Sequence, residues 1–382
     1  LREKIEITLI DARSTSLDKP TLPEVAFTGK PVEHARFPLK TLVERHDAHF
    51  IQARIESVDP QAQKVILEDG TAVPYDYLFI TVGALKDYDA TPGFREYGYS
   101  LCDDAEAPRL WNTLQQFRGG PVVVGSARSH WGSRIEITDL AAPCEGPVGE
   151  VMFMLAHEFE KRGIREQSTI SVFTPGEIFF EDVGEKVHAS MEPLIKGHDI
   201  RVYTSKEIVR ITADRVEFSD GSGLESALTI LLPVYTGNPV IKKSGLGDEM
   251  GFIPTDLRMR HLDHKNIFAA GDANAREMPK LGHIAVMQAD IAAANLKREI
   301  TGKGEIPEHR PEIFCIMNRG GAHATMIISD TLFGGKNDLT FNGPVAHFLK
   351  WSFDTYYFYT RGHMPPDMAQ SFLKSTVKAA HR

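Results

Sequence analysis

The stretch Asn266-Ile267-Phe268-Ala269-Ala270-Gly271-Asp272-Ala273 decides the fold. An apolar run of strand length ends there in Gly-Asp. The segment Pro279-Lys280-Leu281-Gly282-His283 then leads into a run with helical apolar spacing over residues 284–297. The pattern predicts a buried strand, a loop and a helix, in that order. Because such units build sheets covered by helices, we predict an α/β fold with a functional loop at Gly271 and Asp272.

A second strand is predicted near the start of the chain, where Ile5-Glu6-Ile7-Thr8-Leu9-Ile10-Asp11 is alternating, β-branched and ends in an acid. In a dinucleotide-binding βαβ unit, such an acid binds the adenosine ribose and follows a glycine-rich turn about 20 residues upstream. Only ten residues precede Asp11. We therefore expect the first strand and its phosphate-binding turn to lie in a segment before Leu1. A solvated strand cap is the alternative interpretation of Asp11.

Further strands follow. Glu68-Asp69-Gly70 between two apolar runs predicts a hairpin, and residues 75–84 read as a buried strand ending in a tight turn at Gly83. A second α/β unit begins with a strand at residues 119–125. A helix over residues 151–163, strands at 170–174 and 201–204, and further strands within 215–233 complete it.

No G-x-G-x-x-G motif follows the strand at residues 119–125, because the chain continues Ser126-Ala127-Arg128-Ser129. The glycines of that motif let the backbone approach a pyrophosphate. Their absence argues against a nicotinamide cofactor at this position.

Composition narrows the class of protein. The 382 residues suggest two or three domains, and 42% hydrophobic with 25% charged residues is ordinary for a globular chain. A formal charge of −9 argues against a nucleic-acid partner. Three cysteines do not make a secreted disulfide scaffold. No apolar run reaches the roughly 18 residues of a membrane-spanning helix.

The C-terminal part is rich in aromatic residues. Residues 345–359 combine aromatic and basic side chains at helical spacing, and residues 368–380 predict a second short amphipathic helix. Two such helices suit a membrane interface. A helix pair packed on the core explains the same pattern equally well.

The cysteines stand in specific contexts: Gly98-Tyr99-Ser100-Leu101-Cys102, Cys144-Glu145-Gly146-Pro147 with Glu150, and Phe314-Cys315. Together with Thr236-Gly237-Asn238-Pro239, the segment 251–256 and the pair Lys350 and Phe353, these motifs resemble those of the sulfide:quinone oxidoreductases, with the archaeal members most alike. That family belongs to the flavoproteins with two dinucleotide folds.

The resemblance implies a fold and a division into domains. It implies two Rossmann-like domains of the glutathione-reductase type and a C-terminal amphipathic helical region at the membrane interface. We assign residues 1–95 with 240–300 to the FAD-binding domain, 96–239 to a second Rossmann-like domain on the substrate side, and 301–382 to the quinone and membrane-interface region.

The resemblance also implies roles for single residues. Cys144 and Cys315 are expected to form the redox pair, with a persulfide on Cys144 after attack by sulfide and a free thiolate on Cys315. Cys102, also expected to be catalytic, is expected beside the dimethylbenzene edge of the flavin or to aid product release. Glu150 is expected to relay protons to the quinone side. A buried small hydrophobe is the alternative for each cysteine, and a solvated first-turn acid is the alternative for Glu150.

FAD is the expected cofactor, and no metal is expected. The residues expected to bind FAD are Asp11, Ala12, Pro20, Arg54, Ile55, Thr81, Gly83, Cys102, Gly271, Asp272, Lys280, Gly282 and His283. A quinone head group is expected against Gly282, Lys350 and Phe353.

The predicted function is oxidation of sulfide to polysulfide or sulfur, with electrons passing through FAD to a membrane quinone. The expected partners are sulfide, a quinone and the lipid interface, and homo-oligomer formation is left open. We expect a monotopic protein on the cytoplasmic face of a membrane. One alternative is a type II NADH:quinone oxidoreductase, which needs a second glycine motif and no cysteines. The other is a non-catalytic, membrane-attached flavoprotein.

Overall fold

The largest sheet in the computed structural model, which describes residues 5–360 and residue 365, is parallel and five-stranded. Its order is β10-β17-β11-β12-β13, with β10 (Gly98–Tyr99), β11 (Gly120–Ser126), β12 (Ser168–Phe173), β13 (Ile200–Tyr203) and β17 (Leu228–Leu232). The apolar strands β11, β12 and β17 are largely buried, as in parallel sheets covered on both faces. The predicted second α/β unit is confirmed.

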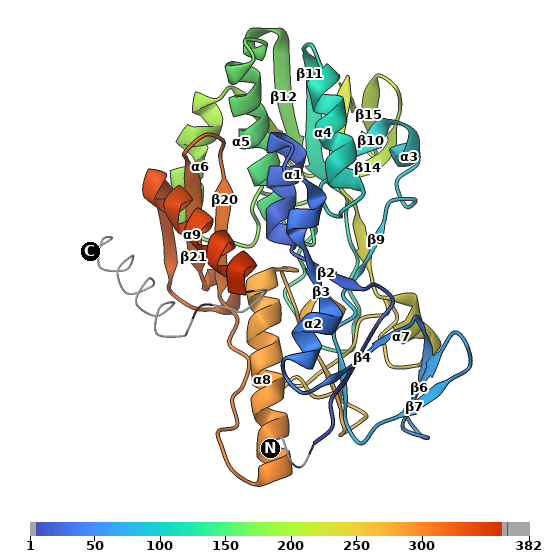
Figure 1. Cartoon of the computed structure of the whole chain (residues 1–382). Helices are drawn as coiled ribbons and strands as arrows, with labels where there is room; N and C mark the ends of the chain where they lie inside the picture. Colours follow the sequence, from blue (N-terminus) through green and yellow to red (C-terminus); the bar gives the residue numbers. More distant parts are fainter. Residues whose placement is uncertain (1–4, 361–364, 366–382) are drawn as a thin grey trace.

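Two further pairs of parallel strands lie in the lower half of the molecule (Figure 1). They are β1 (Thr8–Asp11) with β4 (His49–Gln52), and β8 (Leu78–Ile80) with β19 (Ile267–Ala269). Within the described residues, β1 pairs with β4 alone and β8 with β19 alone. The expectation of an additional strand before Leu1 stays a prediction.

The other strands outside the C-terminal region are antiparallel and form small sheets beside the parallel ones. The hairpin predicted at Asp69-Gly70 is confirmed, and Gly70 has the left-handed φ of 83° that the turn requires. The antiparallel strands are β5 (Ile55–Asp59), β6 (Lys64–Leu67) and β7 (Ala72–Pro74); β14 (Ile208–Ile211), β15 (Arg215–Phe218) and β16 (Gly223–Glu225); β2 (Thr15–Leu17) with β3 (Arg36–Pro38); and β9 (Leu85–Asp87) with β18 (Val234–Thr236).

The C-terminal region contains a sheet that the sequence analysis missed. Strands β20 (Ile313–Asn318), β21 (Ala324–Ser329) and β22 (Asp338–Gly343) form an antiparallel sheet, and α9 (Pro344–Thr360) packs against it through Ala346. The predicted aromatic helix is therefore confirmed as α9. The second predicted helix, residues 368–380, lies outside the described residues.

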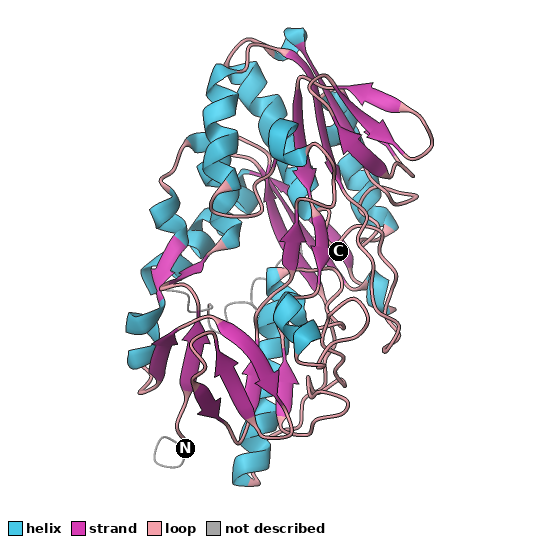
Figure 2. Ribbon diagram, turned by 90° about the vertical axis from the view of Figure 1, so that its right-hand side faces the viewer, coloured by secondary structure: helices cyan, strands magenta, loops and turns pink. Residues whose placement is uncertain are grey.

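The remaining helices surround the sheets, as Figure 2 shows. They are α1 (Leu22–Thr28), α2 (Leu39–Glu44), α3 (Phe94–Tyr97), α4 (Glu106–Gln116), α5 (Gly146–Lys161), α6 (Glu185–Gly197), α7 (Pro239–Lys243) and α8 (Gly282–Thr301). Short 3-10 turns are η1 (Lys19–Thr21), η2 (Val32–Ala35), η3 (Arg165–Gln167), η4 (Gly271–Ala273) and η5 (Thr331–Phe333). Of the helices described, none has the length and apolar character needed to cross a bilayer.

One hydrophobic core joins segments from three parts of the chain. Side chains of α1, α4, α5 and β11 pack together with Ile313 and Met317 of β20. The N-terminal helix and the C-terminal sheet thus both contact the five-stranded unit. The proposed division into three domains stays a prediction.

Candidate active site

Cys144 and Cys315 both lie close to Gly146. A Cβ atom added at Gly146 would be 3.6 Å from Cys144 Sγ and 3.7 Å from Cys315 Sγ. All three cysteines of the chain are free thiols, and Cys144 is buried. The fold therefore brings two sulfur atoms that are distant in the sequence to the same glycine, which leaves space beside both of them.

Two different elements place these sulfurs. Strand β11 ends at Ser126, but α5 begins only at Gly146, so a long loop delivers Cys144 to the N-terminus of that helix. In nucleotide-binding units the helix N-terminus that follows such a strand holds phosphate. Here it holds a thiol. Strand β20 supplies the second sulfur, and strand alternation turns Cys315 with Ile313 and Met317 toward the core that contains α5.

Both thiols are strongly biased toward the protonated form. Burial, Asp182 and Cys315 raise the pKa of Cys144 well above its usual value. Burial and Glu150 raise the pKa of Cys315 to about 12, although Lys350 opposes the shift. Because the thiolate is the nucleophilic form, these cysteines are poor nucleophiles in this state. The pair is better suited to receive attack, as an oxidised S–S unit, than to begin it.

Buried carboxyl groups surround Cys144. Glu145 Oε2 accepts hydrogen bonds from the backbone N–H groups of Phe180 (2.5 Å) and Glu181 (3.3 Å), and burial raises the pKa of Glu145 to about 8. Asp182 is buried, its Oδ1 has no hydrogen-bond partner, and burial raises its pKa to about 6. Groups that titrate this close to neutral pH can exchange protons with the sulfur pair.

The buried Asp182 should make the stability of the protein depend on pH. Its carboxyl binds a proton more tightly in the folded than in the unfolded chain, so the free energy of unfolding falls as pH rises from 3.8 to about 6. Asp182→Asn should therefore raise the free energy of unfolding at pH 8 by about 3 kcal/mol, and the melting temperature with it, with a smaller difference below pH 4. Thermal unfolding at several pH values measures this.

The exposed Asp76 provides the matched control, since Asp76→Asn removes a carboxyl that faces solvent. It should leave the pH profile unchanged. If Asp182→Asn shows the same dependence of stability on pH as the wild type, burial of the Asp182 carboxylate does not destabilise the folded protein at high pH.

Two charged side chains, those of Glu150 and Lys350, lie near Cys315. Lys350 Nζ is 3.9 Å from Glu150 Oε1, and both side chains are about nine-tenths buried. Glu150 Oε1 also accepts a hydrogen bond from the Asn318 backbone N–H (3.0 Å). Burial acts to lower the pKa of Lys350, but Glu150 and Asp354 outweigh it and raise the pKa. The structure thus brings together the predicted proton relay residue and the predicted quinone-side lysine.

Asp354 extends this group along α9. Burial raises the pKa of Asp354 to about 7, against the effect of Lys350, and its Oδ2 has no hydrogen-bond partner. Glu150, Lys350 and Asp354 therefore form a buried set of titratable groups that begins beside Cys315. Such a set can pass a proton between the sulfur pair and α9.

The predicted flavin loop lies next to the segment that carries Cys144, because the Lys280 backbone N–H donates to the Pro143 carbonyl oxygen (2.7 Å). Lys19 Nζ is 3.2 Å from Asp272 Oδ2. Burial acts to raise the pKa of Asp272, but Lys19, Lys280 and Lys86 hold it below its usual value. The structure thus joins η1, which contains the predicted Pro20, to Gly271 and Asp272 in η4.

Open backbone at two glycines marks a cradle near this loop. Gly83, with φ of 69°, follows β8, and Gly282 begins α8; a Cβ at either position would meet no atom within 4 Å. The N-terminus of α8 carries partial positive charge, which favours an electron-rich ring. These features fit the flavin end of FAD, with Gly83, Asp272 and Gly282 as the residues that would hold it.

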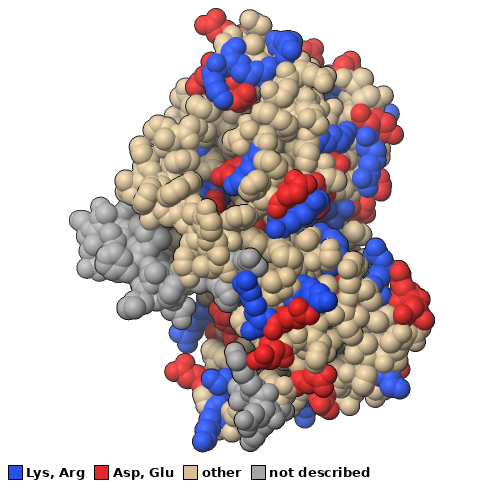
Figure 3. Space-filling model, viewed as in Figure 1, with Lys and Arg blue, Asp and Glu red and all other residues tan. Residues whose placement is uncertain are grey.

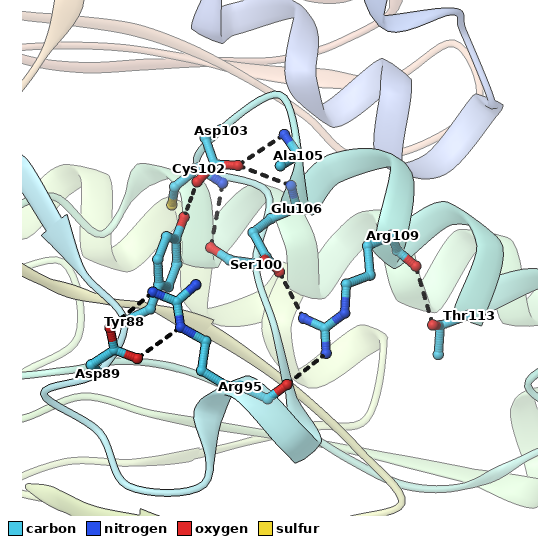
Figure 4. Close-up of polar contacts among 10 residues, drawn as sticks. All are labelled: Tyr88, Asp89, Arg95, Ser100, Cys102, Asp103, Ala105, Glu106, Arg109 and Thr113. Atoms are coloured by element: carbon cyan, nitrogen blue, oxygen red, sulfur yellow. Dashed lines mark hydrogen bonds and ion pairs between the residues drawn. The ribbon is translucent and has the colours of Figure 1, made fainter.

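Cys102 lies near Lys86 and Lys19, and hydrogen bonds fix the segment around it (Figure 4). Its backbone N–H donates to Ser100 Oγ (3.3 Å), and the Tyr88 hydroxyl donates to Asp103 Oδ2 (2.5 Å). The other oxygen of Asp103 accepts backbone hydrogen bonds from Ala105 and Glu106, where α4 begins. Burial raises the pKa of the Cys102 thiol, although Lys86 lowers it. Cys102 thus lies near both the start of α4 and Lys86.

The remaining residues that were predicted to bind FAD make contacts in several parts of the structure. The Asp11 carbonyl accepts a hydrogen bond from Ala53 N–H, which brings Asp11 and Ala12 beside the segment with Arg54 and Ile55. Arg54 pairs with Glu68 (3.2 Å), and Lys280 Nζ donates to the Asn274 carbonyl. Thr81 follows β8, and the His283 ring lies 5.4 Å from that of Phe314. Their contacts with FAD stay predictions.

The exposed face of α9 is apolar. Val345, Phe348 and Trp351 are each more than half exposed, and Tyr359 is 78% exposed. Figure 3 shows few Lys, Arg, Asp or Glu side chains on the surface over this helix. The predicted quinone residue Phe353 lies on α9 with its ring stacked on Tyr357, at 5.8 Å between centroids.

Several site residues escaped the sequence analysis. Asp182, Asp354, Lys19 and Lys86 had no motif around them, and their importance comes from burial and from neighbours far along the chain. Gly146 was quoted only as part of the cysteine motif. The one available signal was its place between Glu145 and Pro147, where a helix begins.

Comparisons with known proteins agree on the family. The model of the pyridine nucleotide-disulphide oxidoreductase family matches residues 1–289. A sulfide-quinone reductase from Aquifex aeolicus is 24% identical, over 99% of this chain and 90% of that protein. A mitochondrial sulfide:quinone oxidoreductase from Mus musculus is 22% identical, over 63% of this chain and 54% of that protein.

The fold agrees as well. The crystal structure of the sulfide:quinone oxidoreductase from Aquifex aeolicus superposes with a TM-score of 0.87 at 24% identity, over 98% of this chain and 90% of that one. The predicted two-domain dinucleotide-binding architecture is confirmed at the level of the fold.

Proposed function

Since this chain belongs to the pyridine nucleotide-disulphide oxidoreductase family, we propose that it oxidises sulfide and passes the electrons through FAD to a membrane quinone. The observation that carries the proposal is the placement of Cys144 Sγ and Cys315 Sγ around Gly146. The relatives named sulfide-quinone reductase support the same substrates.

The sulfur chemistry starts from an oxidised pair. HS⁻ attacks one sulfur of a Cys144–Cys315 disulfide, so one S–S bond forms as the other breaks. Cys144 then carries the persulfide, and Cys315 leaves as the thiolate. Overall, HS⁻ plus quinone plus H⁺ gives zero-valent sulfur plus quinol, so the protein must take up one proton per turnover.

The buried acids supply the proton path. Glu145 and Asp182, with pKa values of about 8 and 6, lie beside Cys144 and can take the proton that HS⁻ releases. Glu150, whose pKa burial raises, contacts Lys350 and lies next to Cys315. Lys350 and Asp354 then lead toward α9, where the quinone must be protonated twice.

FAD, when bound, supplies a two-electron carrier between the sulfur pair and the quinone. The N-terminus of α8 and the open backbone at Gly83 and Gly282 would orient it, and Asp272 would bind its polar chain. Lys350 would stabilise the negative charge of the reduced quinone head, and Phe353 would pack on its ring.

The apolar face of α9 suits the membrane side of this reaction. A quinone with a long apolar tail stays in the bilayer, so the enzyme must approach the lipid. Val345, Phe348, Trp351 and Tyr359 offer exposed apolar and aromatic surface for shallow insertion. We infer monotopic attachment on the cytoplasmic face of a membrane through this helix.

A type II NADH:quinone oxidoreductase is the weaker alternative. It would need a phosphate-binding turn directly after β11, and this chain places a long loop and Cys144 there instead. A non-catalytic flavoprotein would have no need for the paired sulfurs.

Turnover of FAD-loaded protein with decylubiquinone separates these functions. We expect sulfide to support quinone reduction and NADH to fail. Quinone reduction by NADH alone would establish the dehydrogenase, and reduction by neither donor would favour the non-catalytic flavoprotein.

A further inference from the structure

A large apolar cavity of about 880 Å³ lies beside the segment that contains Phe180, whose backbone N–H donates to Glu145, the neighbour of Cys144. Aromatic and aliphatic side chains line it, chiefly Phe179, Phe180, Val183, Met191 and Ile195. This volume falls within the roughly 300–1,000 Å³ of small-molecule sites. The functions assigned above do not use this cavity.

Phe180, which lines the cavity, contacts α5 one helical turn from the sulfur pair. Gly146 and Gly149 are three residues apart and so share one face of α5. A Cβ at Gly149 would be 2.5 Å from the Phe180 ring and 3.3 Å from Met317 Sδ. The Phe180 ring therefore packs directly on Gly149, and Phe180 also lines the cavity.

The segment around Phe180 is tied to both sides of this boundary. Glu145, the neighbour of Cys144, accepts the Phe180 backbone N–H at 2.5 Å. On the cavity side, His188 Nε2 lies 2.9 Å from the Phe180 carbonyl oxygen. Phe180 itself has a φ of 63°, unusual for an aromatic residue, so these contacts hold it in a strained conformation.

The cavity reaches the molecular surface at its far end. Ile178 is half exposed there. Glu192 and Lys196, which also line the cavity, form an ion pair of 2.5 Å with largely exposed side chains. A ligand can thus leave to solvent past a lysine.

We propose that this cavity receives the growing sulfane-sulfur chain and that Phe180 separates it from the Cys144–Cys315 pair. The inference rests on the proposed sulfide oxidation. A chain of zero-valent sulfur is apolar along its length, which matches the apolar walls of the cavity. Asp182, buried with an unpartnered oxygen next to Cys144, lies two residues after Phe180 in the same segment.

Filling the cavity tests this. Ala189 lines it on α6, so Ala189→Phe should occupy space meant for sulfur. Ala293, exposed on α8, gives the matched control Ala293→Phe. FAD-loaded proteins are turned over anaerobically with sulfide and decylubiquinone, then desalted, and retained sulfane sulfur is released with cyanide as thiocyanate.

We expect wild type and Ala293→Phe to retain equal amounts of sulfane sulfur and Ala189→Phe to lose most of it, while sulfide bleaches the flavin equally in all three. Equal retention in all three would overturn the cavity assignment and leave sulfide oxidation standing. A raised KM for decylubiquinone in Ala189→Phe, with sulfur retention unchanged, would also overturn it, since the cavity would then bind quinone. A wild type that sulfide does not bleach would instead remove the proposed function itself.

Discussion

Cys315→Ser should abolish the reduction of the flavin by sulfide. Serine preserves the size and the packing of the side chain between β20 and α5, but it cannot form the S–S bond that HS⁻ attacks or leave as a thiolate. The anaerobic loss of the oxidised flavin band after mixing with sulfide, followed by stopped-flow absorbance, measures the effect. The rate should fall to the background of free FAD.

Cys102→Ser is compared with it, because Cys102 is expected beside the flavin and does not lie at Gly146. It removes no partner of the S–S bond, so sulfide should still reduce the flavin, at a rate that the changed flavin environment alters. Turnover retained in Cys315→Ser would remove this cysteine from the mechanism, and loss of activity in Cys102→Ser alone would move the sulfur chemistry to the other thiol.

Lys350→Met should slow the transfer of electrons to quinone. It removes the ammonium that faces Glu150 Oε1 at 3.9 Å and leaves Glu150 and Asp354 buried without it. Loss of a positioned proton donor typically slows such a step by about 10²-fold or more. Breaking a buried ion pair should also lower the free energy of unfolding by about 3 kcal/mol or more. Reoxidation of sulfide-reduced protein by decylubiquinone, and urea unfolding, measure the two effects.

The double variant Glu150→Gln, Lys350→Met separates stability from chemistry. It removes both charges, so it should recover much of the lost stability while quinone reduction stays slow. Recovery of both would show that Lys350 acts only through folding. An unchanged reoxidation rate in Lys350→Met would exclude this lysine from the quinone step.

The sequence predicted well what depends on local pattern. The apolar run before Gly271 and Asp272, the hairpin at Asp69-Gly70 and the helix from Gly282 follow from propensity and turn chemistry, and the structure has them. The absence of a glycine turn after β11 also proved informative, because the loop that replaces it carries Cys144.

Features that depend on long-range packing were not readable from the sequence. The sheet β20–β22 has a mixed pattern because both of its faces are covered in part, by α5 and by α9. The contact of Glu150 with Lys350 joins distant segments through the fold alone. Asp182 has no distinguishing neighbours in the sequence, and only its burial beside Cys144 gives it a role.

Anaerobic titration of the FAD-loaded wild-type protein with sulfide tests the central claim most directly. We expect sulfide to bleach the oxidised flavin band and NADH to leave it unchanged. A flavin band that persists in excess sulfide would contradict the account, because the sulfur pair around Gly146 would then not deliver electrons to the cofactor.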